Sequence, residues 1–376
     1  MKTEDLLSEI MKLSPELSSN YCVINGTLIE LGKVEKMGCS EFGLQSELHM
    51  PLKLYRYYSN IEKDNNGQAV NHSQDALKTN TVFMNSPVEF DDAYDSEISL
   101  EYSEFERFRL IEYCRRCHIK ANSNSSNQEI GNAFVQFLWK YYCEHKKLDG
   151  VFAEPPKSEI ERLSNEEFCL RTIVEYCKNK DFGKAVSNVI QKEYGEQCDK
   201  LKNTFRIACF ATTPYSQLMW ASYADSHKGF CVEYTVQPNT KEYEKIYYNL
   251  FPVIYCKMRS DITQYIAENR DQMPDEEYLW NLYFHGALRK SIDWAYQNEW
   301  RLLLPYGIKD KDYNVEFFPI TKVYLGNKMS AESRKEIISI CKDKGIPYAG
   351  VTRNPTKFEM QDCEILCENC PRYQNQ

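Results

Sequence analysis

The sequence lacks the short motifs that mark most familiar catalytic sites. None of its 15 glycines belongs to a phosphate-binding loop of the type G-x-x-x-x-G-K-[ST], and no G-x-G-x-x-G segment is present. Segments of the type H-E-x-x-H and G-x-S-x-G are also absent. The six histidines are scattered along the chain. These absences argue against the usual kinase, hydrolase and metalloprotease sites.

Long apolar runs are absent as well, and none approaches the roughly 20 residues that cross a bilayer. The first residues do not combine a basic start, an apolar run and a small-residue cleavage site, as a secretory signal does. We therefore expect a cytoplasmic protein without a membrane partner. In that compartment most of the 15 cysteines should be free thiols. Those inside apolar patterns should be buried as small hydrophobic residues: Cys177, Cys209, Cys231 and Cys256.

Basic residues are outnumbered, and the formal net charge of the chain is −9. This balance argues against a protein held on nucleic acid by bulk electrostatics. The chain of 376 residues is long enough for one elaborated domain or two modest ones. Aromatic residues make up 13%, with 27 tyrosines, so the chain can both fill a core and line a pocket for a flat ligand.

The spacing of apolar residues predicts an α+β protein whose β-rich core is interrupted by helices. We expect an N-terminal extension over residues 1–50, a core over 51–350 with a helical insertion at about 98–203, and a cysteine-rich tail over 351–376. The expected core strands are residues 52–59, 205–213, 230–236, 250–258, 299–307 and 320–326. The expected core helices are residues 215–225, stopped by Gly229, then 276–294 and 330–345.

Two cysteine clusters have the spacing of metal ligands. They are the C-x3-C-x2-C set Cys363, Cys367 and Cys370, and the trio Cys114, Cys117 and His118. A zinc or iron–sulfur site needs four matched ligands, and each cluster supplies three. The alternative is that these residues are ordinary thiols, as the helical spacing around Cys114 indicates. We therefore predict no bound metal.

An acidic segment, EFDDAYD, follows an expected strand and contains Glu89, Asp91, Asp92 and Asp95. Grouped carboxylates bind Mg²⁺ or Ca²⁺ through their oxygens. Aspartate is also a common turn residue because its side chain accepts hydrogen bonds from the nearby backbone. Both interpretations of this acid turn (residues 89–95) stay open.

Several segments together resemble a large bacterial family, domain of unknown function 2971. They are LYRYYS, VFMNSPVEFDDAYD, CFATTPYSQLMWASYADSHKGFCVEY, DWAYQNEWRLL and KVYLG, which span about residues 52–350. Members resemble accessory genes of mobile and phage-defence islands. The resemblance implies a phage-defence or toxin-type effector, with a phage-derived molecule as a possible trigger.

Three of these segments also resemble the Arg, Ser/Thr-x-Ser/Thr, Gln/Glu-x-Glu order of arginine-type ADP-ribosyltransferases. They are KLYR, FATT and QNE, and the resemblance implies an ADP-ribosyltransferase-like core. Arg56 would then contact the phosphates and ribose of NAD. Thr212 and Thr213 lie in the Ser/Thr motif, whose first hydroxyl is replaced by Ala211.

In the same resemblance Glu299 is the catalytic acid, and Gln297 contacts the acceptor, a protein or a nucleic acid. Cleavage of the nicotinamide–ribose bond passes through an oxocarbenium-like state, which a carboxylate stabilises. Tyr55, Tyr57 or Tyr215 would stack on the nicotinamide. The hypothesis is an ADP-ribosyltransferase or NAD glycohydrolase that consumes NAD as its substrate.

Other interpretations of these residues remain open. Arg56 would instead pair with a surface acid, and Glu299 would form a buried pair with Arg301 or Lys290. At the level of function, one alternative is a binding module without enzymatic activity. Its helical insertion would sense a partner, and its β core would be an inert scaffold. A third possibility is a nuclease that uses a divalent ion, with the metal held by three acids: Asp91, Asp92 and Asp95.

Overall fold

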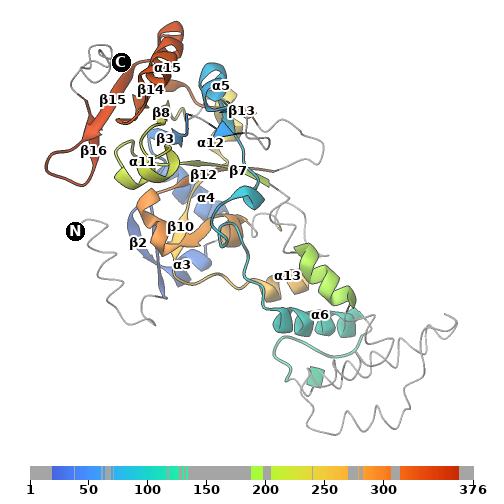
Figure 1. The fold of residues 1–376 in the computed structure, drawn as a ribbon. Coiled ribbons are helices and arrows are strands. Elements are labelled where there is room, and N and C mark those ends of the chain that lie inside the picture. Colours follow the sequence, from blue (N-terminus) through green and yellow to red (C-terminus); the bar gives the residue numbers. More distant parts are fainter. Residues whose placement is uncertain are drawn as a thin grey trace, which may run out of the picture. The chain divides into compact units, whose positions relative to one another are not determined.

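The computed structural model describes residues 19–363, apart from residues 38, 61, 64–68, 71, 117, 127–128, 131–132, 134–187, 198–204, 239, 270–277, 279–282 and 306–313. The chain divides into two compact units (Figure 1). The first unit contains Met1–Ser96, Asn203–Met258 and Leu288–Gln376. The second unit contains Glu97–Lys202 and Arg259–Ala287. The protein is of the α+β class, as the apolar spacing predicts.

A five-stranded sheet forms the largest layer of the first unit, in the order β16-β15-β14-β8-β3. The strands are β3 (Lys53–Tyr58), β8 (Phe230–Thr235), β14 (Ile320–Leu325), β15 (Tyr348–Arg353) and β16 (Met360–Asp362). Only the β14–β15 pair of this sheet is parallel. Its last strand lies beyond residue 350, so the compact unit extends further than the core expected from the sequence.

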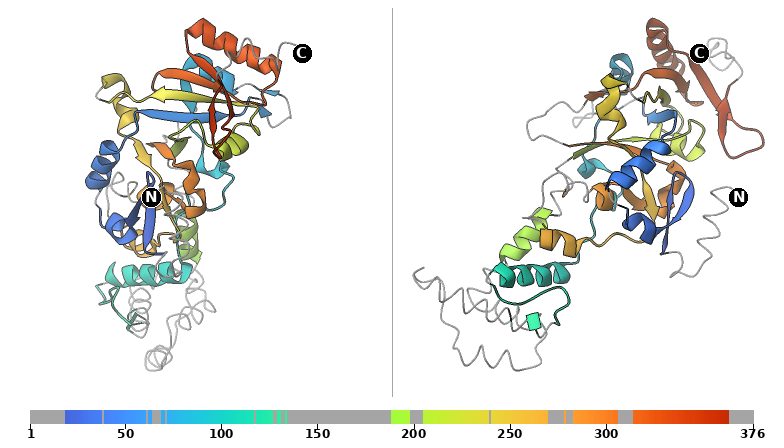
Figure 2. Two further views of the ribbon diagram at one scale, coloured as in Figure 1. Left: turned by 90° about the vertical axis from the view of Figure 1, so that its left-hand side faces the viewer. Right: turned by 180° about the vertical axis from the view of Figure 1, so that it is seen from behind.

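Side chains of this sheet alternate between two buried clusters, because successive residues of a strand point to opposite faces. Leu54 and Tyr58 of β3 belong to the larger cluster, whereas Tyr55 and Tyr57 belong to the smaller one. Helix α15 (Ala331–Lys344) adds Ile337 and other apolar side chains to the larger cluster. Figure 2 shows α15 lying along this sheet.

A second sheet of three strands, β7-β12-β9, brings distant parts of the chain to β3. Its strands are β7 (Phe205–Phe210), β12 (Trp300–Pro305) and β9 (Leu250–Pro252). Beyond β7, the amide of Ala211 donates to the Tyr55 carbonyl at 2.7 Å, and the Tyr55 amide donates back at 2.9 Å. This bridge fixes the FATT segment beside the strand that contains Arg56.

A third sheet contains β11 (Arg289–Ser291), β10 (Ile254–Cys256), β1 (Tyr21–Ile24) and β2 (Thr27–Glu30). The β1–β2 turn is made by Asn25 and Gly26, both with positive φ (49° and 70°), as expected for an Asn-Gly hairpin. Strands β1 and β2 come from the expected N-terminal extension and are part of the compact unit.

Two element assignments from the sequence were wrong in this part of the chain. The apolar run 250–258 is two strands in two different sheets, β9 and β10, separated by Val253. The helix expected over 276–294 does not reach its predicted end, because β11 is a strand and η4 (Ile292–Gln297) is a 3-10 helix. Strand β11 forms because its backbone pairs in parallel with β10, and such tertiary pairing overrides helical spacing.

Helix ends in the first unit follow the usual capping rules. The side chain of Ser330 accepts a hydrogen bond from the Ser333 amide and caps α15, which ends at Gly345 in the left-handed conformation (φ 64°). Ser216 caps α11 (Gln217–Tyr223) in the same way. The other helical segments of this unit are α3 (Leu31–Glu35), α4 (Cys39–Leu48), α5 (His72–Thr79), η1 (Pro87–Glu89), η2 (Lys241–Tyr243) and α12 (Glu244–Tyr247). The remaining short strands are β4 (Glu62–Lys63), β5 (Ala69–Val70), β6 (Thr81–Phe83) and β13 (Asn314–Glu316).

The described part of the second unit is mainly helical. It contains α6 (Tyr102–Arg116), helical residues 188–197, α13 (Thr263–Asn269) and a π-helical turn, η3 (Tyr283–Ala287). Arg109 of α6 is buried and pairs with Glu193 at 2.7 Å. Much of the expected insertion, residues 134–187 and 198–203, lies outside the described residues, so the insertion as a whole stays a prediction.

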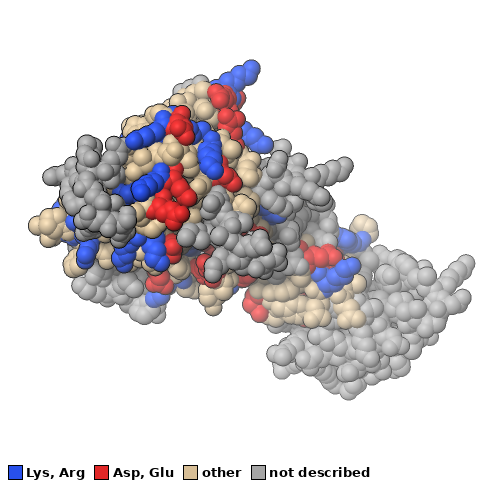
Figure 3. All heavy atoms as spheres, turned by 45° about the horizontal axis from the view of Figure 1, so that its top comes forward, with Lys and Arg blue, Asp and Glu red and all other residues tan. Residues whose placement is uncertain are grey.

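Charges of both signs are mixed on the surface that Figure 3 shows, where lysine and arginine side chains are interspersed with aspartate and glutamate. No helix among the described residues has the length and apolar character needed to cross a bilayer.

Seven cysteines whose side chains the structure describes are free thiols, and five of them are buried: Cys22, Cys114, Cys231, Cys256 and Cys341. Burial raises the pKa of the Cys22 and Cys341 thiols to about 12, which keeps them neutral. Three members of the two cysteine clusters, Cys117, Cys367 and Cys370, lie outside the described residues.

Candidate functional site

The candidate site is a cavity of about 430 Å³ in the first unit. Its wall is made by β3, the acid turn, β7, α11, Lys290 of β11, and the segment from η4 to Glu299. Six aromatic side chains line it: Tyr55, Tyr57, Phe90, Phe210, Tyr223 and Trp294. Its volume falls within the usual range of small-molecule sites, and an aromatic wall suits a flat ligand.

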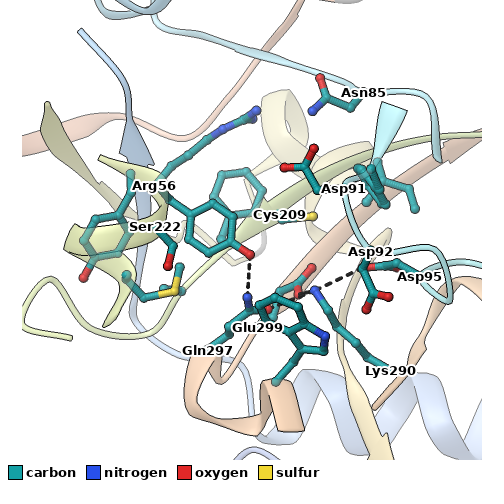
Figure 4. A pocket seen from close by; sticks show the side chains of 18 of the residues that line it. Arg56, Asn85, Asp91, Asp92, Asp95, Cys209, Ser222, Lys290, Gln297 and Glu299 are labelled. Atoms are coloured by element: carbon teal, nitrogen blue, oxygen red, sulfur yellow. Dashed lines mark hydrogen bonds and ion pairs between the residues drawn. The ribbon is translucent and has the colours of Figure 1, made fainter. Parts of the chain in front are cut away.

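Four ionised residues with buried side chains form a cluster that we call the ion quartet: Asp95, Lys290, Glu299 and Arg301. The first three line the cavity. Arg301 is 0% exposed, and its Nη1 and Nη2 donate to the two carboxylate oxygens of Asp95 at 2.8 and 2.7 Å. The Nε of Arg301 donates to Glu299 at 2.6 Å. Lys290 Nζ lies 3.1 Å from a carboxylate oxygen of Glu299 and 3.0 Å from one of Asp95. Figure 4 draws the Lys290 amine between these two acids.

These pairs determine the charge states of the quartet. Burial alone would raise the pKa of Glu299, but Arg301 and Lys290 outweigh it and lower that pKa. Asp95 responds in the same way to the same two cations, and its pKa is also lowered. Burial would lower the pKa of Lys290, and the adjacent Glu299 and Asp95 raise it instead. All four groups are therefore charged at neutral pH, and their charges sum to zero.

The lowered pKa values of Asp95 and Glu299 predict that the protein loses stability in acid. Their stabilisation is fully present above the unfolded-state pKa values of about 4, and it is lost as the pH falls through the folded-state values. Lys290 acts oppositely, and its contribution is lost only as alkaline pH passes its raised pKa. The melting temperature should therefore fall steeply below about pH 4.

The double variant Glu299→Gln/Lys290→Met is the control for this acid transition. It removes one of the two acids with lowered pKa and keeps the net charge of the quartet at zero. Its melting temperature, followed by differential scanning fluorimetry, should fall less steeply below about pH 4 than that of the wild type. Identical acid slopes would show that the quartet does not contribute to the acid transition.

Arg56 lines the cavity from β3 and has unused hydrogen-bonding capacity. Its Nη2 donates to the carbonyl of Phe83 at 2.9 Å. The guanidinium carbon lies 5.4 Å from the ring centre of Tyr58 and 5.9 Å from that of Phe210. Its Nη1 is buried and has no hydrogen-bond partner among the described residues. Arg56 also makes no ion pair with the acids that the structure describes, so the expected pairing with a surface acid is not seen.

Gln297 and Tyr55, both expected from the sequence, line the cavity too. The Gln297 carbonyl accepts from Lys290 at 3.0 Å, and its amide donates to the Tyr223 hydroxyl at 2.6 Å. The Tyr55 hydroxyl donates to Glu233 at 3.2 Å. Gln297 and Glu299 are separated by two positions, and both side chains contact Lys290.

Of the Ser/Thr motif, Ala211 lines the cavity, and Thr212 and Thr213 do not. The hydroxyl of Thr212 accepts from the Asn298 amide at 2.7 Å, and that of Thr213 accepts from the Tyr215 backbone amide at 3.2 Å. The Tyr215 hydroxyl donates to Asp362 at 3.1 Å. Tyr57 does line the cavity, and its hydroxyl donates to the Thr213 carbonyl. Of the residues that the resemblance assigns to NAD, Arg56, Tyr55 and Tyr57 line the cavity, and Thr212, Thr213 and Tyr215 do not.

The acid turn contributes residues of three different kinds. Asp95 is buried in the ion quartet, which its sequence position did not indicate. Asp92 accepts from the Tyr94 amide at 2.9 Å, as expected for a turn residue. Asp91 is exposed and lines the cavity. Among the described residues, no three His, Cys, Asp or Glu side chains are arranged to hold a metal ion.

The quartet could be found from the sequence only in part. Glu299 and Arg301 are two positions apart at the start of a strand, so both point to one face. This spacing, and the buried pairing of Glu299 with Arg301 or Lys290, followed from the sequence. Asp95 lies 206 positions before Arg301, and no local pattern connects them.

Comparison with known proteins gives one match. Residues 219–302 match a family model described as protein of unknown function (DUF2971). The match covers α11 to the start of β12, including Lys290, Gln297 and Glu299, and it supports the family resemblance seen in the sequence. No curated protein and no solved structure matches the chain.

Proposed function

We propose that this protein is an ADP-ribosyltransferase or an NAD glycohydrolase that consumes NAD. Its role would be that of a phage-defence or toxin-type effector. The observation that carries the proposal is that Arg56 of β3 and the Gln297–Glu299 pair before β12 line one cavity. The positions of these residues in the sequence do not by themselves require them to line one cavity. The residues are brought together by the bridge between β3 and the FATT segment and by the pairing of β7 with β12.

The chemistry of the cavity suits a dinucleotide that is flat at one end and anionic in the middle. The guanidinium of Arg56 can pair with the diphosphate, because a planar guanidinium is well matched to phosphate. The aromatic wall can stack on the nicotinamide. Glu299 holds the amine of Lys290, and Lys290 in turn holds the side-chain carbonyl of Gln297. The polar atoms of both residues are therefore preorganised in the wall.

The alternative of a metal-dependent nuclease has less support. It relies on three acids of the acid turn, but both oxygens of Asp95 already accept from Arg301. Only Asp91 and Asp92 of that set keep carboxylate oxygens available. The acceptor of the ADP-ribosyl group, a protein or a nucleic acid, follows from the resemblance alone.

The expected result is that the purified chain binds NAD and releases nicotinamide. Arg56→Ala should raise the Kd for NAD about 10- to 100-fold, because it removes a charge-assisted hydrogen bond worth about 1.5–3 kcal/mol. Nicotinamide release followed by chromatography and NAD binding followed by calorimetry check this.

Arg353→Ala is the matched control, since Arg353 is exposed on β15 and does not line the cavity. It should bind NAD like the wild type. If the wild type neither binds NAD nor releases nicotinamide, the proposal is wrong and a binding module is favoured. Loss of RNA or DNA that depends on Mg²⁺ would favour the nuclease instead.

A further inference from the structure

The charge of Glu299 is largely cancelled where it lies. One carboxylate oxygen accepts from Arg301 Nε, and the other accepts from Lys290 Nζ. Asp95 balances the remaining positive charge of the quartet. Because two unit charges in contact interact far more strongly than either does with a charge several ångströms further away, the quartet offers little net negative charge to a ligand.

Four ionised side chains that line the cavity have no ion-pair partner among the described residues: Arg56 and three members of the acid turn, Glu89, Asp91 and Asp92. Arg56 lies on one wall without an ion-pair partner among the described residues. Asp91 lies on the acid turn, and its carboxylate accepts no hydrogen bond from any residue that the structure describes. In the view of Figure 4, the Asp91 carboxylate lies between the Arg56 guanidinium and the Lys290–Glu299 pair. The wall therefore has one uncompensated cation and three uncompensated anions. Asp92 accepts a hydrogen bond from the Tyr94 amide, whereas Asp91 is drawn on the side of the cavity that separates Arg56 from the quartet.

NAD⁺ has a matching polarity, since its nicotinamide ring is a pyridinium cation and its diphosphate is anionic. We infer that Asp91 is the carboxylate that faces the nicotinamide–ribose end of NAD⁺, while Arg56 holds the diphosphate. This inference rests on the proposed function. It makes the Asp91 carboxylate the catalytic group, and it makes Glu299 a positioning residue that holds Lys290 and Arg301.

The reaction balances with water as the nucleophile. The bond between ribose C1′ and the nicotinamide nitrogen breaks, and its electron pair leaves with the nitrogen to give neutral nicotinamide. The positive charge that develops on C1′ is stabilised by the Asp91 carboxylate. A water oxygen bonds to C1′, and Asp91 accepts the released proton and returns it to solvent. An acceptor hydroxyl or amine can take the place of water.

NAD⁺ and NADH make a ligand pair that isolates the role of Asp91. They share the diphosphate, but the reduced ring of NADH carries no charge. NADH binding is followed by its own fluorescence, and NAD⁺ binding by displacement of NADH. Asp91→Asn should raise the Kd for NAD⁺ about tenfold and leave the Kd for NADH within about twofold. Arg56→Ala should raise both by the same factor.

Turnover supplies a second readout. Asp91→Asn should lower kcat for nicotinamide release by about 10²- to 10³-fold, as expected when a group that stabilises developing charge is lost. Asp91→Glu keeps the carboxylate and should retain the preference for NAD⁺ over NADH. Asp343→Asn, on an exposed position of α15, makes the same chemical change outside the cavity and should alter neither Kd nor kcat.

The outcomes separate the inference from the proposed function. If the wild type releases nicotinamide but Asp91→Asn leaves kcat and the Kd for NAD⁺ unchanged, or weakens NAD⁺ and NADH equally, the assignment of Asp91 is overturned and the function stands. If the wild type binds neither nucleotide and releases no nicotinamide, the function is overturned and the assignment with it.

Discussion

Replacing Glu299 by glutamine is expected to destabilise the first unit by about 3–5 kcal/mol. The amide keeps the shape of the side chain but leaves three charges in the quartet, with two cations facing one carboxylate. Arg301 is 0% exposed, so water cannot compensate for the lost partner. The melting temperature should drop on the order of 10 °C, which calorimetry or circular dichroism would detect.

A double-mutant cycle distinguishes loss of charge balance from loss of shape. Lys290→Met alone should also be strongly destabilising. The double variant Glu299→Gln/Lys290→Met restores neutrality and keeps the bidentate Asp95–Arg301 pair. Its loss of stability should therefore be smaller than the sum of the two single losses by about 1–3 kcal/mol.

The exposed pair of Lys78 and Asp75 supplies a control for this cycle. Lys78→Met should change stability by no more than about 1 kcal/mol, since solvent screens exposed pairs. If Glu299→Gln melts like the wild type, the quartet is not what holds Glu299 in place. The functional interpretation of Glu299 as the catalytic acid would then regain its support.

Much of the first unit could be predicted from local patterns. Alternation of apolar residues identified the strands that became β3, β8, β12 and β14, because each has at least one buried face. The Ser330 cap and the Gly345 stop identified α15. The buried pairing of Glu299 with Arg301 or Lys290 is also one of the two interpretations that the sequence gives for this residue.

The rest depends on pairings between distant segments. Lys290 was assigned to a helix because its neighbours have helical spacing, yet parallel pairing with β10 makes it a strand residue. Asp95 is one acid among four in a turn, and its burial depends on pairing with Arg301 of β12. Of the residues that the three-part resemblance names, Arg56, Gln297 and Glu299 line the cavity, and Thr212 and Thr213 do not. The threonine hydroxyls accept hydrogen bonds from the Asn298 amide and from the Tyr215 backbone.

Gly229 illustrates the same limit at a single residue. The sequence suggested that it stops the helix before it, as a cap. In the structure α11 ends at Tyr223, and the Gly229 amide donates to the Ala224 carbonyl at 2.8 Å. A Cβ atom at residue 229 would lie 2.0 Å from the carbonyl oxygen of Tyr58 on β3. Glycine is needed here for close approach between backbones.

Gly229→Ala is therefore expected to destabilise the first unit by about 3 kcal/mol or more, because the clash is with backbone and not with a flexible side chain. To make room, the start of β8 must move away from Tyr58 of β3. Arg56 lies two positions before Tyr58 on the same strand. The variant should lose melting temperature and NAD binding together. Gly43→Ala, within α4 and with no atom within 4 Å of its Cβ, makes the same chemical change and should instead gain about 0.5–1 kcal/mol through helix propensity. Equal melting temperatures for the two variants would mean that β3 and β8 do not approach each other as closely as described. In that case the position of Arg56 in the cavity would not depend on Gly229.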